Sequence, residues 1–247
     1  MDWVKEFFDG DYYRRDYLAV AHDTERTEKE SAFLLNTLEL KPTDHCLDLA
    51  CGSGRHVMAL AGEVAHITGY DRTAAYIDLA NQTRDATGVE NVEFHVADMR
   101  EVSDEARFDA AWNYFTAWGY YDDETNFDVL KRIRRALKPG GRFLLETINR
   151  DMIMTIFQPH DFKRYDDGTV VLYDRRFDFA TGRNHTKYTY ISEKGEQSLE
   201  IDHYMPTADA LVRHFRDAGF NDVLMIGAPD GGELTLTHNR MACVGYV

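Results

Sequence analysis

The chain is short of cysteine and proline, and it has no long hydrophobic run. Its 247 residues include three cysteines, without C-x-x-C spacing, and five prolines. An odd, unpaired cysteine set argues against a secreted disulfide framework. No run approaches the ~18 apolar residues of a membrane span, and the N-terminal segment lacks the basic-then-apolar order of a signal peptide. We therefore expect a cytoplasmic protein without a membrane partner.

Basic residues are scarce relative to acidic ones. The chain has 28 lysines and arginines against 43 aspartates and glutamates, which gives a formal net charge of −15. Such a charge repels phosphate backbones, so nucleic acid is not an expected partner. Apolar residues make up 44% of the chain, as in ordinary globular proteins, and the length suits one large domain or a domain with an insertion.

Short apolar runs alternate with helical patterns in the middle of the chain. The runs predict buried strands at residues 45–50, 66–70, 92–97, 108–115 and 142–148. The clearest helical pattern begins near Asp122 or Asp123 and is stopped by the segment 139–141. This alternation predicts an α/β fold, with a mostly parallel sheet covered by helices on both faces. Ligands of such sheets bind beyond the carboxyl ends of the strands.

The pattern changes after residue 150. Three β-like runs, at 169–179, 185–192 and 197–204, are separated by short turns, which predicts an antiparallel meander. A helix over about 207–218 and two closing strands, 222–226 and 240–246, follow. One α/β domain with an antiparallel insertion after its fifth strand accounts for this order.

The segment LDLACGSGRH, residues 47–56, is the most informative part of the chain. It predicts a strand, a glycine loop and a helix, an arrangement that lets a ligand approach the backbone closely. The fingerprint of a dinucleotide site requires a small residue at the sixth position counted from Gly52, but this position is Val57. In addition, the negative charge of Asp48 would lie beside the negative pyrophosphate. This weighs against a dinucleotide-dependent oxidoreductase and favours a ligand with a positive group.

With this loop the sequence resembles the class I S-adenosylmethionine-dependent methyltransferases, whose first motif is an acidic residue, a spacer and a short G-x-G-type loop. The resemblance covers residues 28–247. It implies a Rossmann-like, seven-stranded sheet, with S-adenosylmethionine as cofactor and S-adenosylhomocysteine as product. It also implies that Asp48 meets the cofactor's ammonium group, and that Ala50, Gly52 and Gly54 line its methionine part. Ala50 replaces the first glycine, a common variant in the family.

Two more acidic residues follow predicted strand ends. Asp71 lies about 20 residues past the glycine loop, where a carboxylate accepts from two ribose hydroxyls, and we count the adjacent Arg72 with the same site. The resemblance implies that Asp98 accepts from the adenine amino group, that Met99 packs on the ring, and that Asn113 bonds cofactor backbone atoms. Each acid could instead cap a helix or turn, but their order along the chain makes the combination specific.

Aromatic residues gather in two segments, FFDGDYYRRDY at 7–17 and NYFTAWGYY at 113–121. In layout the chain is most similar to the small-molecule N-methyltransferases that act on amino sugars. That similarity implies an aromatic N-terminal cap in which a tyrosine, Tyr13 or Tyr17, and Arg26 hold the cofactor's carboxylate, although Arg26 could equally be a solvated charge. Aromatic faces attract a cationic methyl donor or an amine; the alternative is that these rings only fill the core.

The sequence therefore predicts a methyltransferase (EC 2.1.1.-) that transfers a methyl group to N or O of a small molecule by in-line displacement, in which orientation contributes most. A general base is optional, so the catalytic residue stays unassigned, with Tyr13, Tyr114 and His203 as candidates. No H-E-x-x-H or cysteine–histidine cluster predicts a metal site. The alternatives are a non-catalytic regulatory subunit and a macromolecule methyltransferase. A monomer or a homodimer is expected.

We divide the expected single domain, residues 1–247, into four parts. Residues 1–40 form an N-terminal cap and the first helix, and residues 41–150 form the cofactor-binding core. Residues 151–205 form the antiparallel insertion, as a substrate lid or a dimer contact. Residues 206–247 supply the last helix and two closing strands of the core.

Overall fold

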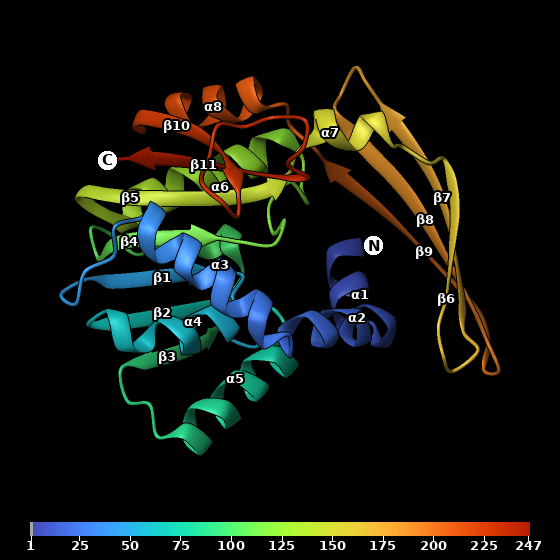
Figure 1. The fold of residues 1–247 in the computed structure, drawn as a ribbon, viewed down its shortest axis with the longest axis horizontal. Coiled ribbons are helices and arrows are strands. Elements are labelled where there is room, and N and C mark those ends of the chain that lie inside the picture. The colour runs from blue at the N-terminus through green and yellow to red at the C-terminus, as the bar shows by residue number, and fades with distance from the viewer. Residues whose placement is uncertain (1) are drawn as a thin grey trace.

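The computed structural model describes residues 2–247, apart from the side chain of Tyr12. Its larger sheet has seven strands in the order β10-β11-β5-β4-β1-β2-β3 (Figure 1). β1 to β5 are parallel where they pair, and β11 is antiparallel to both β5 and β10. The bounds are β1 His45–Leu49, β2 His66–Asp71, β3 Val92–Val96, β4 Phe108–Asn113, β5 Leu137–Ile148, β10 Asn221–Ala228 and β11 Arg240–Tyr246. The predicted fold class is confirmed.

Helices cover both faces of this sheet, and each face has its own apolar core. α3, α4 and α5 pack on one face through residues such as Leu34, Val57 and Ile77. α6 and α8 pack on the other through Leu130 and Phe215. The bounds are α3 Thr24–Thr37, α4 Arg55–Leu60, α5 Ala74–Thr87, α6 Asp123–Ala136 and α8 Ala208–Asp217, with 3₁₀ turns η1 Ala61–Glu63 and η2 Met99–Glu101. The helix that was predicted to run up to the segment 139–141 ends earlier, at Ala136. That segment lies inside β5.

The insertion after β5 is larger than the sequence indicates. It begins with α7, Arg150–Thr155, and forms a four-stranded antiparallel sheet in the order β6-β7-β8-β9. The bounds are β6 His160–Arg164, β7 Val170–Asp178, β8 Arg183–Ser192 and β9 Gly195–Tyr204. β6 has no alternating apolar pattern because all five of its residues are exposed, which explains why only three strands were expected.

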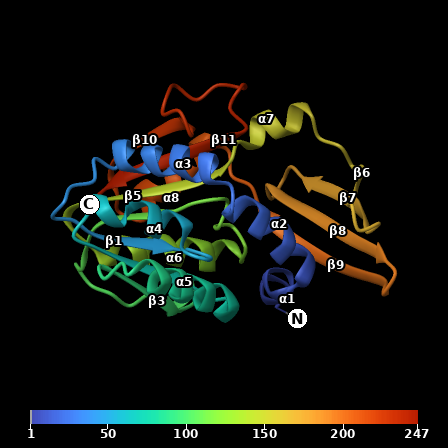
Figure 2. The same cartoon turned by 60° about the horizontal axis from the view of Figure 1, so that its bottom comes forward.

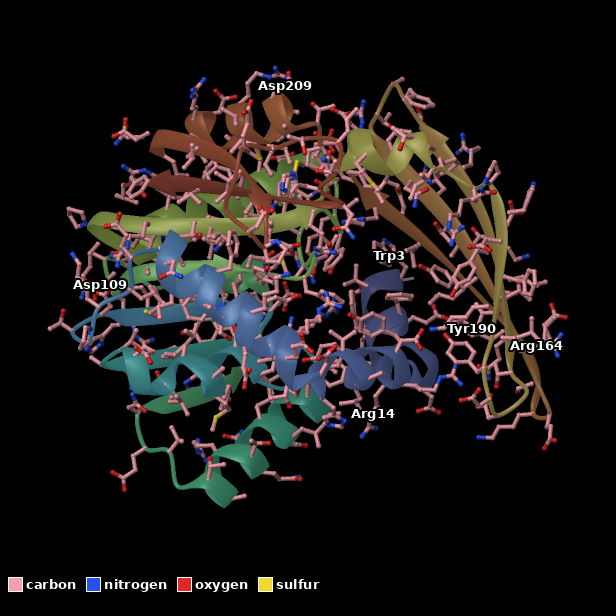
Figure 3. All side chains as sticks on the ribbon, viewed as in Figure 1. Trp3, Arg14, Asp109, Arg164, Tyr190 and Asp209 are labelled. Carbon is pink, nitrogen blue, oxygen red and sulfur yellow. The ribbon has the colours of Figure 1, made fainter. Side chains whose placement is uncertain are left out.

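Two short helices, α1 Trp3–Asp9 and α2 Asp11–Ala21, fill the space between the two sheets (Figures 1 and 2). α1 contacts β9, and the ring of Phe7 lies 5.4 Å from that of Tyr188 in β8. Trp3 and Tyr190 lie near this space, whereas Asp109 lies at the far end of the core sheet (Figure 3). The N-terminal segment therefore stands at the carboxyl ends of the parallel strands, where ligands of such sheets bind.

Candidate active site

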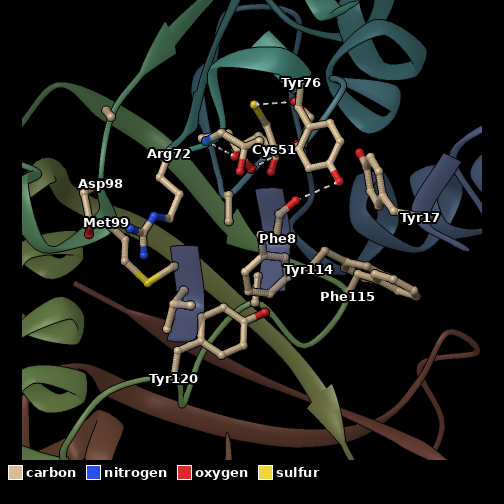
Figure 4. A pocket seen from close by; sticks show the side chains of 18 of the residues that line it. Phe8, Tyr17, Cys51, Arg72, Tyr76, Asp98, Met99, Tyr114, Phe115 and Tyr120 are labelled. Carbon is tan, nitrogen blue, oxygen red and sulfur yellow. Dashed lines mark hydrogen bonds between the residues drawn. The ribbon is translucent and has the colours of Figure 1, made fainter. Parts of the chain in front are cut away.

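A cavity of about 800 Å³, including its open mouth, lies beneath α1 and α2 at the carboxyl ends of the core strands (Figure 4). Eight of the eleven residues predicted to bind the cofactor line it: Tyr17, Asp48, Ala50, Gly52, Asp71, Arg72, Asp98 and Met99. Arg26, Gly54 and Asn113 are not among its lining residues. No residue between 151 and 205 lines it either, so the insertion does not form its wall.

The glycine loop between β1 and α4 is bound by the cap. Ala50, Gly52 and Gly54 all adopt left-handed backbone angles, with φ of 63°, 55° and 77°. A Cβ on Gly52 would lie 2.0 Å from the Tyr17 hydroxyl, which accepts a 2.7 Å hydrogen bond from the Ser53 amide. A Cβ on Gly54 would instead lie 2.6 Å from Phe94. Gly52 thus lets α2 contact the loop, while Gly54 lets α4 pack against the sheet.

Asp48 is a buried carboxylate without a full set of partners. Its side chain lies at the end of β1, and the residue is 2% exposed. Among the described residues, none donates a hydrogen bond to its Oδ2 atom. Burial raises the pKa of Asp48 to about 7. Because an unpaired buried charge is costly, this cavity suits a ligand that brings a positive group, as the ammonium of S-adenosylmethionine does.

Asp71 supports the glycine loop as well as facing the cavity. Its Oδ2 accepts from the Gly52 amide and its Oδ1 accepts from the Thr73 amide, both at 2.8 Å. Burial raises the pKa of Asp71 despite these bonds. A carboxylate has about four acceptor sites, so two remain for ribose hydroxyls. The bond to Thr73 precedes α5, whose N-cap is Thr73 and has no side-chain capping bond, so Asp71 is not the helix cap that the sequence left as an alternative.

Arg72 and Asp98 are both engaged in ion pairs at the cavity. Asp98 pairs with Arg100, whose Nη2 lies 2.7 Å from Oδ2. Burial alone would raise the pKa of Asp98, but the hydrogen bonds from Arg100 hold it below its ordinary value. Arg72 pairs with Asp2, which caps the N-terminus of α1, at 2.8 Å. Arg72 therefore connects the end of β2 to the cap.

A cluster around Glu30 supplies a cation that sequence reasoning missed. Buried Glu30 lies 2.8 Å from Arg26 Nε, 2.5 Å from Arg55 Nη2 and 3.1 Å from His56 Nε2. Burial would raise the pKa of Glu30, but its hydrogen bond with His56 and the charge of Arg55 lower it to about 2. Arg55 lines the cavity, whereas the predicted Arg26 does not. Arg55 directly follows Gly54 in the motif, a position that could have singled it out.

Asn113 joins two backbone segments through hydrogen bonds of its side chain. It is 1% exposed, and its Nδ2 donates to the carbonyl of Leu49 at 2.9 Å and to that of Ala117 at 3.3 Å. The side chain thus ties the end of β1 to the loop that follows β4. Its place in the structure is a support for the cavity wall.

Aromatic rings from the cap, α5 and the β4–α6 loop form the rest of the wall. The ring of Phe8 lies 4.7 Å from that of Tyr13 and 5.1 Å from that of Tyr120. The rings of Tyr17 and Tyr76 are 4.7 Å apart. Burial raises the pKa of Tyr17 to about 12 and that of Tyr13 well above its ordinary value. These hydroxyls are therefore neutral at physiological pH.

The three candidate catalytic residues do not meet at one point. Tyr13 and Tyr114 line the cavity. His203 lies outside its lining, 7% exposed, and its Nε2 is 2.8 Å from the carbonyl of Trp118.

The described residues contain no group of three or more histidines, cysteines or acids arranged to hold a metal ion. Within the same part of the chain, no helix is long and apolar enough to cross a membrane.

Comparisons with known proteins find methyltransferases that resemble this chain in sequence and in fold. Residues 46–141 match the family described as "Methyltransferase domain". The structure is similar to an S-adenosylmethionine-dependent methyltransferase from Clostridium acetobutylicum, with a TM-score of 0.78, 14% identity, and coverage of 96% of this chain and 99% of that one. This match and this similarity agree with S-adenosylmethionine as the predicted cofactor, and one similar solved structure, that of CalS10, holds it bound.

Two further similarities are to a solved structure and to a curated relative. The amino pentose methyltransferase CalS10 from Micromonospora echinaspora is similar in structure, with a TM-score of 0.66, 19% identity, and coverage of 96% of this chain and 97% of that one. The methyltransferase ungE' of Aspergillus campestris is 28% identical over 225 residues, 87% of this chain and 60% of that protein. The chain spans 15% to 60% of the length of three curated relatives, two of which are 23S rRNA methyltransferases matched over 74 and 66 residues.

Proposed function

We propose that this protein is a methyltransferase that transfers the methyl group of S-adenosylmethionine to a nitrogen or oxygen atom of a small molecule. The observation that carries the proposal is the incompletely bonded carboxylate of Asp48, in a cavity whose other walls are acids at strand ends and aromatic rings. The similarity to an amino pentose methyltransferase supports a small acceptor. The net charge of −15 weighs against RNA, because acidic surfaces repel phosphate.

The lining residues fit the cofactor group by group. Asp48 would hold the ammonium group, and Arg55 would hold the carboxylate of the methionine part in place of Arg26. Asp71 would accept from the ribose hydroxyls. Asp98 would accept from the adenine amino group, beside Met99, which is buried in the same wall.

Bound S-adenosylmethionine supplies a methyl group already activated by its sulfonium, so the residues of the chain mainly orient the acceptor and exclude water. The rings of Phe8, Tyr13 and Tyr120 cover the cavity from the cap and from the β4–α6 loop. The tyrosyl hydroxyls with raised pKa values are neutral hydrogen-bonding groups and not bases. This favours a neutral amine as acceptor, which attacks with its lone pair and needs no base, over an alcohol.

Isothermal titration calorimetry with S-adenosylmethionine, S-adenosylhomocysteine and NAD tests the cofactor assignment. We expect micromolar binding of the first two and none of NAD. Asp71→Ala should weaken both interactions, since it removes the ribose acceptor and the bond to the Gly52 amide. Methyl transfer is then sought with radiolabelled cofactor and a panel of amines, alcohols and carboxylates. Binding of NAD without any response to S-adenosylhomocysteine would overturn the proposal.

A further inference from the structure

The loop after β4 contains a strained turn on the cavity wall. Phe115 and Thr116 have φ values of 66° and 59°, a left-handed conformation that is unfavourable for residues other than glycine. Phe115 lines the cavity next to Tyr114. Two consecutive left-handed residues persist only where surrounding contacts fix them.

A buried ion pair between β5 and β11 provides them. Glu146 is fully buried, and its Oε2 accepts from the Phe115 amide at 2.7 Å and from the Thr116 amide at 3.3 Å. The Nη2 atom of Arg240 donates to the same oxygen and to Thr116 Oγ1, each at 2.6 Å. The Nε atom of Arg240 donates to Glu146 Oε1. All four residues therefore form one hydrogen-bonded unit.

This unit continues into the cap. The carbonyl of Thr116 accepts a 2.6 Å hydrogen bond from the hydroxyl of Tyr120. The ring of Tyr120 lies 5.1 Å from that of Phe8 and 5.9 Å from that of Trp3, both in α1. Figure 4 shows the rings of Phe8 and Tyr120 next to each other in the lining of the cavity. A contiguous set of contacts thus runs from two core strands to the first helix of the chain.

We propose that Glu146 and Arg240 are positioning residues, which set the strained turn at Phe115 and Thr116 and, through Tyr120, the place where α1 covers the acceptor side of the cavity. The inference rests on the proposed function, since it assigns these contacts to the site of methyl transfer. A buried ion pair is weak grounds for stability, because apolar residues of equal volume often serve as well. Here, however, one carboxylate accepts from two backbone amides and a guanidinium, a combination that apolar residues cannot replace.

Glu146→Gln tests the proposal with little change in volume. An amide has one acceptor oxygen, and its NH₂ group would face the guanidinium of Arg240. We expect hydrogen exchange in residues 114–121 and 3–9 to accelerate about tenfold, while calorimetry shows S-adenosylhomocysteine binding within about threefold of wild type. Arg240→Lys keeps the charge but cannot reach Glu146 and Thr116 together, and should give a smaller change in the same two segments.

Two further variants separate positioning from general stability. Tyr120→Phe removes only the hydroxyl that meets Thr116, so exchange should accelerate in α1 and not at residues 115–116. Asp44→Asn breaks a second buried ion pair, in which Asp44 Oδ2 lies 2.5 Å from Arg142 Nη2 and whose residues do not line the cavity. This matched control should leave both segments within about twofold of wild type.

The outcomes separate the possible failures. If Glu146→Gln and Asp44→Asn accelerate exchange alike throughout the core, the pair is only structural and the inference is wrong. It is also wrong if exchange rises at residues 114–116 in Glu146→Gln but α1 is unaffected in every variant. If wild-type protein does not bind S-adenosylhomocysteine, the proposed function fails instead, whatever the variants show.

Discussion

Cofactor binding should release a proton from Asp48. In the free protein, burial raises the pKa of this carboxyl to about 7, so it is largely protonated at pH 6. A ligand ammonium group next to it favours the ionised form. Binding of S-adenosylhomocysteine at pH 6 therefore has to expel that proton, and affinity should increase with pH up to about 7 and then level off.

The raised pKa of Asp48 also makes the stability of the folded protein depend on pH. The pKa of Asp48 rises from 3.8 to about 7 in the folded protein. Between these values the folded state holds a proton that the unfolded state has lost, so stability falls as pH rises. At 1.36 kcal/mol per unit, the loss is about 4 kcal/mol at pH 8. Asp48→Asn, which cannot ionise, should be more stable than wild type at pH 8 and similar to it at pH 4.

Calorimetry in two buffers of different ionisation enthalpy measures the proton directly. At pH 6 a group with a pKa of about 7 is ~90% protonated, so we expect release of ~0.9 proton per S-adenosylhomocysteine bound, and ~0.1 at pH 8. Asp48→Asn should bind more weakly and release almost none. Proton release that is absent in wild type, or unchanged in Asp48→Asn, would refute the assignment of Asp48 to the ammonium group.

Three further changes test contacts on the cavity wall. Gly52→Ala places a methyl group 2.0 Å from the Tyr17 hydroxyl, and calorimetry should show at least about tenfold weaker S-adenosylhomocysteine binding, ~1.4 kcal/mol. Tyr17→Phe removes the acceptor of the Ser53 amide, and urea unfolding should show a loss of about 1 kcal/mol. Arg55→Gln should weaken cofactor binding by about 1.5–3 kcal/mol. Its matched control, Arg26→Gln, loses the same partner Glu30 and should change the affinity little. Equal losses of affinity in the two variants would show that Arg55 does not bind the cofactor.

Much of the core could be predicted because its signals are local in the sequence. Most of the parallel strands are buried on both faces and therefore appear as apolar runs, and the acids lie within or just beyond the ends of these runs. The insertion was predicted only in part, because the exposed residues of β6 carry no periodic pattern. The sequence predicted an aromatic cap at α1 and α2 but not that it would be helical. The apolar side chains of these helices face both the cavity and the insertion sheet, so they do not form the single apolar stripe of an ordinary amphipathic helix.

The site, too, could be predicted only where its signals are local in the sequence. Sequence order placed Asp48 and Asp71 at neighbouring strand ends, and the structure brings both to one cavity. The contact of Glu146 with Arg240 joins residues 94 positions apart, and neither lies in a recognisable motif. Arg55 and Arg26 are both cations near the glycine loop, and only the three-dimensional structure shows which of them reaches the cavity wall.

The insertion contacts the cap on the side away from the cavity. Its residues do not line the cavity, but Asp16 of α2 accepts from the hydroxyl of Tyr165 at 2.6 Å and lies 3.3 Å from Lys163, and Arg15 lies 3.0 Å from Asp167. Partly exposed ion pairs such as these contribute only about 0–1 kcal/mol each. The cap is therefore held on its outer side by these ion pairs and by the ring contact of Phe7 with Tyr188, and on its inner side by Tyr17 and Tyr120. Because the cavity lies beneath it, we expect the cap to open to admit a ligand and to close over it, and hydrogen exchange in residues 3–21 should slow when S-adenosylhomocysteine binds.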